Sequence, residues 1–367
     1  MDKERVFDKK MSQGIKGIAV LMMLMHHSFL HSSWFIGYSV STFPFSEYSI
    51  IKLAELCKIC VSFFAFITGY GLYLNYCDNK ESAQKWVAKR YVSTFSGFWF
   101  AWIMSFAVLE IKYQRFSKIL IGENNIFTGI VNGIVNILGL SNLFITPTPD
   151  TRWWYMSAAI LFIFLTPMMY RFRNELGMVL LGELLLLRVI FVQQDNSVLL
   201  GMRAVYAFVT PYIFGCIFAR YDIFDKWCTL GNGKVAIKIY KFIAELWVIL
   251  FLCKMYTNTS KELLWELNYG IFPVIIILFL TEFVLQVSVI KKCMKYIGIH
   301  SANIYYIHSF VIYYHPEVLY KMHFVVTITI WLCLSLATSI LIELAKRITR
   351  YNSLIKWVLT NEIKQPT

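Results

Sequence analysis

The chain has 367 residues, of which 58% are hydrophobic and only 16% are charged, and its mean hydropathy is +0.57. This composition is too apolar for a soluble globular domain and is typical of polytopic helical membrane proteins. The net charge of +13 is interpreted as a signal of topology and of contact with lipid headgroups. Membrane lipids are therefore expected neighbours, and nucleic acid is not an expected partner.

Ten apolar segments follow one another along the chain, and most approach the length of about 20 residues that a membrane-spanning helix needs. They lie at about 14–31, 48–73, 91–111, 153–170, 175–193, 203–219, 236–253, 269–288, 301–314 and 324–345. We therefore predict an all-α, polytopic integral membrane helical bundle of about ten transmembrane helices, in which the short ninth segment fits least well. A single integral membrane domain is expected over residues 1–367, with short cytoplasmic tails at about 1–13 and 346–367.

Lysine and arginine residues mark the cytoplasmic side of the predicted spans. They precede the first span and follow every even-numbered one, whereas the loop at 32–47 contains neither residue type, so both termini are predicted in the cytoplasm. The long third loop departs from this pattern, because Lys112, Arg115, Lys118 and Arg152 lie on its predicted outer side. The N-terminal segment lacks a small-residue cleavage pattern, so we predict an uncleaved first span in a multi-pass protein of the cell membrane.

The first span carries two adjacent histidines, His26 and His27. The helical rise from Lys16 to His27 covers about 16 Å, half of the hydrocarbon thickness, so His27 is predicted near the bilayer midplane. Helical rotation also places Lys16 and His27 on one face, whereas His26 points about 100° away and is expected to pack or to support its neighbour. A polar side chain at this depth usually faces a bundle interior or a wet cavity. The alternative is a histidine pair that neighbouring helices satisfy.

A further histidine, His308, lies about 10 to 12 Å into the ninth predicted span. This depth is close to that of His27, so His308 is expected either to complete a site or to orient its partner. His300 and His315 lie near the ends of the same span and are expected in interfacial or loop roles. The eight cysteines are interpreted as small apolar fillers, and no metal site is predicted.

Five segments carry motifs in chain order. The first is Lys16–His27, a cation separated by ten residues from a histidine, and the others are Ser62-Phe63-Phe64-Ala65-Phe66-Ile67-Thr68-Gly69-Tyr70, Lys89-Arg90-Tyr91-Val92, Trp153-Trp154-Tyr155-Met156-Ser157-Ala158 and Gly298-Ile299-His300-Ser301-Ala302-Asn303-Ile304-Tyr305-Tyr306-Ile307-His308. Together they resemble the membrane-bound acyltransferase-3 family, which usually has arginine where Lys16 stands. A second arginine that the family often has after Arg90 is replaced here by Ser93.

The resemblance implies an integral membrane O-acyltransferase of the bacterial cytoplasmic membrane. The implied reaction transfers an acetyl group from the donor substrate acetyl-CoA to a hydroxyl of a cell-surface polysaccharide (capsule, exopolysaccharide or wall glycan) or of its lipid-linked precursor. His27 is the expected catalytic base or nucleophile, because a neutral imidazole accepts a proton near neutral pH. Residues expected to support it are His26, His308, Tyr70, Ser157 and Asn303. Cations expected to bind the phosphates of the donor are Lys16, Lys89 and Arg90.

Several alternatives stay open. A transporter or flippase for a glycan or small metabolite would use the intramembrane histidines and charged residues as a proton relay, although no clear internal repeat is present. Lys89 and Arg90 are equally explained as cytoplasmic anchors of the third span. Trp153 and Trp154 are more simply interpreted as interfacial anchors than as a sugar-stacking surface. The sugar, the acylated hydroxyl and the oligomeric state are left open.

Overall fold

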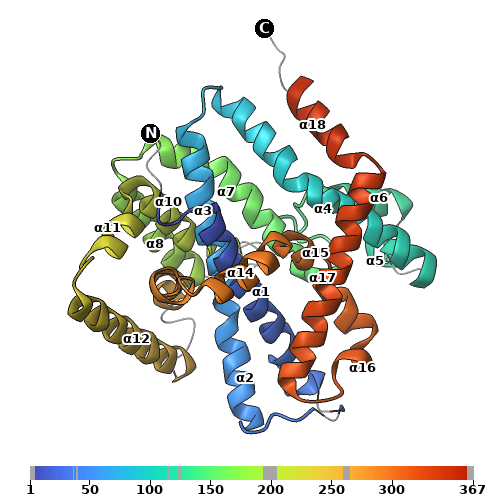
Figure 1. Cartoon of the computed structure of the whole chain (residues 1–367). Helices are drawn as coiled ribbons and strands as arrows, with labels where there is room; N and C mark the ends of the chain where they lie inside the picture. Colours follow the sequence, from blue (N-terminus) through green and yellow to red (C-terminus); the bar gives the residue numbers. More distant parts are fainter. Residues whose placement is uncertain are drawn as a thin grey trace.

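The computed structural model describes residues 5–35, 37–38, 40–113, 116–122, 125–192, 205–258 and 265–361. Within these residues the chain is all-α: it forms no β-strand, and the one isolated β-bridge joins Ser41 to His323. The predicted all-α fold is therefore confirmed. Figure 1 shows α1 (Lys9–Phe29) near the centre of the bundle, with the other helices arranged around it.

Ten helical segments coincide with the ten predicted spans. They are α1, the run of α2 (Glu47–Leu56), η2 (Cys57–Ile59) and α3 (Cys60–Cys77), α4 (Ala83–Tyr113), α7 (Trp154–Arg171), α8 (Leu176–Val192), α10 (Val209–Tyr221), α12 (Val235–Asn258), the run of η4 (Glu266–Ile271), α13 (Phe272–Phe279) and η5 (Leu280–Val284), α15 (Ser301–Tyr314) and α17 (Phe324–Ile348). In the described residues, four helices are long and apolar enough to cross a membrane: Ala83–Ile111, Thr151–Arg171, Leu267–Val284 and Phe324–Ile348. The chain is thus a multi-helix membrane protein, and ten complete crossings remain a prediction.

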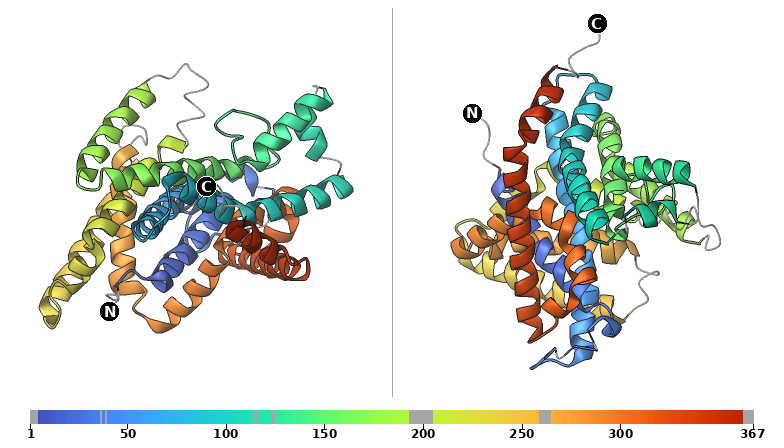
Figure 2. Two further views of the ribbon diagram at one scale, coloured as in Figure 1. Left: turned by 90° about the horizontal axis from the view of Figure 1, so that it is seen from above. Right: turned by 90° about the vertical axis from the view of Figure 1, so that its right-hand side faces the viewer.

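Shorter helices complete the bundle: η1 (Ser32–Trp34), α5 (Phe116–Ile121), α6 (Ile126–Ile137), η3 (Thr151–Trp153), α11 (Ile223–Thr229), α14 (Ser288–Ile299), α16 (Pro316–Leu319) and α18 (Tyr351–Asn361). Figure 2, seen from above, places α12 and the α5–α6 pair at opposite edges of the molecule. Their outer side chains are apolar and exposed, as at Phe127 (73%) and Trp247 (66%). Because lipid tails solvate such side chains well, these edges are expected to face lipid.

Helix α1 begins at a side-chain cap and continues without a break. The Asp8 carboxylate accepts a hydrogen bond from the Met11 backbone N–H at 2.7 Å, which satisfies one of the exposed donors at the helix start. The helix then runs for 21 residues to Phe29. Lys16 and His27 therefore keep the regular spacing that places them on one face.

Glycines let the central helices approach backbone to backbone. Gly17 of α1 and Gly298 of α14 each face a backbone carbonyl of the opposite helix, so that a Cβ atom at either position would overlap it. Gly69 of α3 and Gly215 of α10 make the same kind of approach. Small residues commonly allow helices in membranes to pack this closely. The first contact fixes α14 against the half of α1 that carries Lys16.

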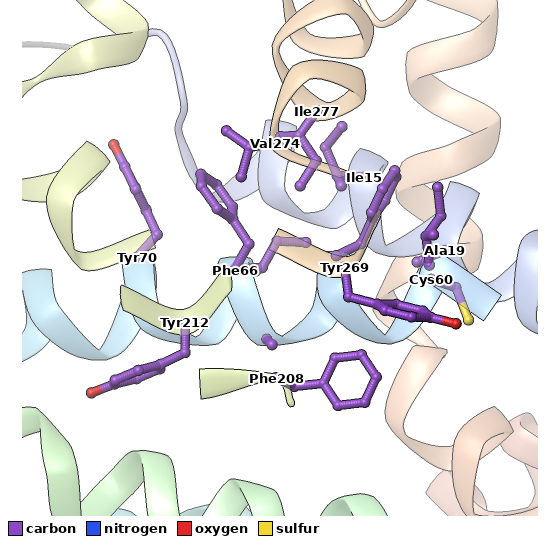
Figure 3. Close-up of a cluster of buried hydrophobic side chains, with 14 of the residues drawn as sticks. Ile15, Ala19, Cys60, Phe66, Tyr70, Phe208, Tyr212, Tyr269, Val274 and Ile277 are labelled. Atoms are coloured by element: carbon purple, nitrogen blue, oxygen red, sulfur yellow. The ribbon is translucent and has the colours of Figure 1, made fainter. Parts of the chain in front are cut away.

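The main hydrophobic core lies beside these crossings. Figure 3 shows Ile15 of α1, Phe66 of α3 and Ile277 of α13 in one cluster, and all three side chains are fully buried. Cys60, at the start of α3, belongs both to this core and to the wall of a cavity. The core therefore fixes the positions of α1 and α3. Polar residues of both helices line the cavity between them.

Candidate active site

A cavity of about 280 Å³ lies between α1, α3, α4, α7 and α15 and is called here the histidine cavity. Both Lys16 and His27 line it, so the face predicted from their spacing is turned toward it. The other polar residues of its lining are His26, Lys58, Thr68, Thr94, Arg152, Tyr155, Ser301, Tyr305 and Tyr306. Much of the remaining wall is apolar, and a few polar groups converging in an apolar enclosure are typical of a ligand site.

His27 and His308 lie against each other, with their ring centroids 5.1 Å apart and their planes at 33°. His308 is only 1% exposed and stands behind His27, outside the cavity lining. Its Nδ1–H donates to the carbonyl oxygens of Tyr305 at 2.9 Å and Ile304 at 3.2 Å, which leaves Nε2 as an acceptor. Within the described residues, Nε2 is buried and has no hydrogen-bond partner. The structure thus brings together the two histidines that were predicted at similar depth.

His26 has a different environment from His27, although both line the cavity. The side chain of His26 is 8% exposed, and its Nδ1 lies 2.9 Å from the carbonyl oxygen of Ala54, to which Nδ1–H donates. This hydrogen bond joins α1 to α2. Its ring also meets the ring of His27 edge to face, at 4.9 Å between centroids. His26 therefore holds the backbone beside His27 in place, and its role in supporting catalysis stays a prediction.

Arg152 belongs to this site, although sequence reasoning assigned it only to an outer loop. It lies in η3 directly before α7, lines the histidine cavity, and places its charge near both His27 and His308. The Asp150 carboxylate accepts a hydrogen bond from the Arg152 backbone N–H at 2.9 Å, lies 3.7 Å from Arg152 Nη1, and also accepts the Ser309 hydroxyl. One feature of the sequence marks Arg152 as unusual: it breaks the positive-inside pattern, directly before a span that begins with two tryptophans.

The three predicted donor-binding cations are not equivalent in the structure. Lys16 is half-buried, lines the histidine cavity, and forms no ion pair with a described residue. Lys89 lies 2.5 Å from a carboxylate oxygen of Glu81, and the guanidinium of Arg90 lies 5.9 Å from the ring centroid of Trp86. Neither Lys89 nor Arg90 lines this cavity. Of the three, Lys16 is the one positioned to touch a ligand inside it.

Three other predicted supporting residues lie outside the cavity wall. Tyr70 lies between Thr68 and Leu72 of α3, which both line the cavity, but its own ring points away from the cavity and packs against Phe7 and Phe224. The Ser157 hydroxyl donates to the Gly139 carbonyl oxygen at 2.7 Å and so fixes α7 to the preceding loop. Asn303 donates to the Glu343 carboxylate at 2.9 Å and lines a polar cavity between α4, α15, α17 and α18, which shares Thr94, Ala302 and Tyr306 with the histidine cavity. Any support that these residues give to His27 would act through helix positions.

The arrangement around His27 has the components that acyl transfer requires. A neutral imidazole facing the cavity can accept a hydroxyl proton, and the ring of His308 packs against it. The positive charge of Arg152 suits the negative charge that develops on a carbonyl oxygen under attack. Among the described residues, no group of three or more histidine, cysteine or acidic side chains is placed to hold a metal ion.

Comparison with known proteins gives one clear match. The family model of the acyltransferase-3 type, described as an acyltransferase domain, matches residues 12–344 of this chain. The matched range contains most of α1, the residues of the histidine cavity and most of α17. No curated protein and no solved structure matches the chain.

Proposed function

Because the chain belongs to the acyltransferase-3 family, we propose that it transfers an acetyl group from cytoplasmic acetyl-CoA to a hydroxyl of a cell-surface polysaccharide or its lipid-linked precursor. Family membership makes it a membrane acyltransferase. The acetyl donor, the sugar hydroxyl and a bacterial cytoplasmic membrane are the proposed part. The observation that carries the proposal is the contact between His27 and His308 at a cavity that Lys16 also lines.

In the proposed reaction, the acceptor hydroxyl oxygen attacks the thioester carbonyl carbon while His27 takes the hydroxyl proton. A C–O bond forms and the C–S bond breaks, so that the acetyl group becomes an ester. The proton held by His27 then passes to the leaving thiolate and regenerates neutral imidazole. Arg152 stabilises the oxyanion of the tetrahedral intermediate by its charge.

His308 acts in this scheme as a positioning residue. Its Nδ1–H is committed to two backbone carbonyls, so its Nε2 lone pair is available on the ring that packs against His27. The proposed role of His308 is to hold the ring of His27 in position by packing against it. The role matches the prediction that His308 completes or orients the site.

The donor is proposed to enter past Lys16. Acetyl-CoA carries several phosphate charges at one end and the thioester at the end of a long, thin arm. Lys16 and His27 are separated by about 16 Å along one helix face. When a phosphate of the donor lies near Lys16, the arm extends along this face and brings the thioester to His27. Lys89 and Arg90, in the first turns of α4 outside the cavity, would contribute long-range attraction to the same anionic end.

The proposal is tested with purified protein in detergent, [¹⁴C]acetyl-CoA, and surface polysaccharide stripped of its acetyl esters by mild alkali. We expect label to enter the polysaccharide as an ester that a second alkali treatment releases, together with equimolar free coenzyme A. A transporter would leave both substrates unmodified. Intact donor and unlabelled polysaccharide, in the presence of folded protein, would overturn the proposed reaction.

A further inference from the structure

A second cavity, of about 440 Å³, adjoins the histidine cavity and is called here the threonine cavity. Its wall is formed by the loop before α7, and it shares one residue, Trp154, with the histidine cavity. Its polar lining residues are Ser141, Asn142, Thr146, Thr148 and Thr151. The volume lies in the range of small-molecule sites.

The chemistry of the threonine cavity differs from that of the histidine cavity. No residue of its lining carries a charge, whereas Lys16, Lys58 and Arg152 line the histidine cavity. A polyanionic donor is therefore poorly matched to it. Hydroxyl and amide side chains beside an indole are suited to a neutral polyol, because they exchange hydrogen bonds with hydroxyls while the indole covers an apolar ring face.

Trp154 and its neighbour Trp153 have separate roles. Trp153 is 2% exposed, and its Nε1–H donates to the Tyr306 carbonyl oxygen at 3.0 Å, so it anchors α7 to α15. Trp154 is half-buried, packs against Phe208 at 5.4 Å between ring centroids, and reaches both cavities. Trp154 is therefore the residue at which the two cavities meet.

The loop that forms the threonine cavity is held in shape before any ligand binds. The Asn136 side-chain amide donates to the Pro147 carbonyl oxygen at 2.7 Å. The Thr146 backbone N–H donates to the Ser141 carbonyl oxygen at 3.0 Å. Ile145 has a φ of 52°, a strained conformation for a β-branched residue. The Thr146 hydroxyl is buried and has no partner among the described residues. A preformed wall with an unmet hydrogen-bonding group favours a polar ligand.

We propose that the threonine cavity binds a neutral sugar residue of the acceptor glycan, with one face of the sugar ring on Trp154. This inference rests on the proposed function and assigns its acceptor subsite. The sugar hydroxyls pair with the hydroxyl and amide groups of the loop, and the hydroxyl to be acylated points past Trp154 toward His27. The donor enters the histidine cavity from the side of Lys16, so the two substrates meet at the histidine pair.

The test compares Michaelis constants for the two substrates, with alkali-treated polysaccharide as acceptor and [¹⁴C]acetyl-CoA as donor. We expect Trp154→Ala to raise the KM for polysaccharide about 30-fold and to raise the KM for acetyl-CoA far less. Thr151→Val, which keeps the side-chain shape, should raise the polysaccharide KM about 3- to 10-fold. Trp154→Phe should restore most of the affinity.

The matched control is Trp247→Ala, which removes an exposed tryptophan of α12 away from both cavities. It should change neither Michaelis constant. An unchanged polysaccharide KM in Trp154→Ala and Thr151→Val, or an equal rise in both constants, would overturn the subsite.

A second readout separates this inference from the proposed function. Saturation-transfer NMR with lactose and chitobiose as probes measures sugar binding without catalysis. Binding by the parent protein that is lost in Trp154→Ala supports the subsite even if no ester is formed, in which case only the acetyl transfer is wrong. Absence of binding by the parent, together with an unchanged polysaccharide KM, rejects the subsite alone.

Discussion

The adjacent residues His26 and His27 have different neighbours, and their variants should differ accordingly. We expect His27→Ala to lower kcat by about 10²- to 10⁴-fold, because the proton acceptor is lost. His26→Ala should retain part of the activity and lower the unfolding temperature, because the Ala54 carbonyl loses its buried donor. Initial rates of acetyl transfer and thermal unfolding in detergent measure both effects. A His27→Ala protein as active as the parent would contradict the catalytic assignment.

Lys16 provides a second prediction at the residue scale. Lys16→Gln keeps a polar side chain, shorter by one atom, and removes its charge, so the KM for acetyl-CoA should rise about 10- to 100-fold while the KM for the glycan stays constant. Lys16→Arg should largely preserve donor affinity. If Lys16→Gln instead changed the orientation of the protein in the membrane and left donor affinity intact, Lys16 would be a topological anchor only.

At the residue scale, the sequence predicted what a single helix determines. The positions of Lys16 and His27 follow from regular helical geometry, and the structure places both at one cavity. Arg152 could not be found in this way, because it is far from His27 in the sequence. Only the packing of separate helices brings both residues to one cavity. Tyr70 illustrates the converse: a motif residue can lie on the core-facing side of a helix whose neighbouring residues, Thr68 and Leu72, line the cavity.

At the scale of elements, hydrophobic runs predicted the helices but not their interruptions. The second predicted span is divided by the 3₁₀ turn η2, and the eighth contains two π-helical stretches, η4 and η5. Hydropathy does not reveal such irregularities, because it is averaged over a whole span and carries no information on the backbone hydrogen-bond pattern. The crossing of α1 and α14 was equally hidden, because α14 is too short and too basic to be recognised as a span.

The glycine contact between α1 and α14 leads to a prediction at this scale. Gly17→Ala places a methyl group against the Met294 carbonyl, so α14 must move, at a cost of about 1–3 kcal/mol of unfolding free energy. The matched control is Gly71→Ala in α3, where a Cβ atom meets nothing within 4 Å and helix propensity improves. Thermal unfolding in detergent should therefore show a lower midpoint for Gly17→Ala and an equal or higher one for Gly71→Ala. Equal midpoints for both would show that the crossing is loosely packed.

At the scale of the whole molecule, the helix ends that carry basic residues lie toward the same end of the bundle. In Figure 1, α1 and α4 start and α17 ends in the upper half of the molecule. The positive-inside rule assigns this end to the cytoplasm. Arg152, by contrast, precedes α7 on the predicted outer side, yet it lines the same cavity as Lys16. The histidine cavity therefore connects residues that the topology assigns to opposite sides of the bilayer.

This connection predicts acetyl transfer across the bilayer. In proteoliposomes, radiolabelled acetyl-CoA is supplied on the face that carries the termini, and glycan acceptor is supplied on the other face. Ester-linked label should accumulate on the acceptor, because the donor reaches His27 from the side of Lys16 and the acceptor from the side of Arg152.

Liposomes with His27→Ala are the control, and protease access to the C-terminal tail fixes the orientation. Ester formation only when both substrates share one face would contradict transfer across the bilayer. Passage of unmodified glycan with a proton dependence and no ester would instead identify a transporter, since a relay of histidines moves protons without forming a covalent product.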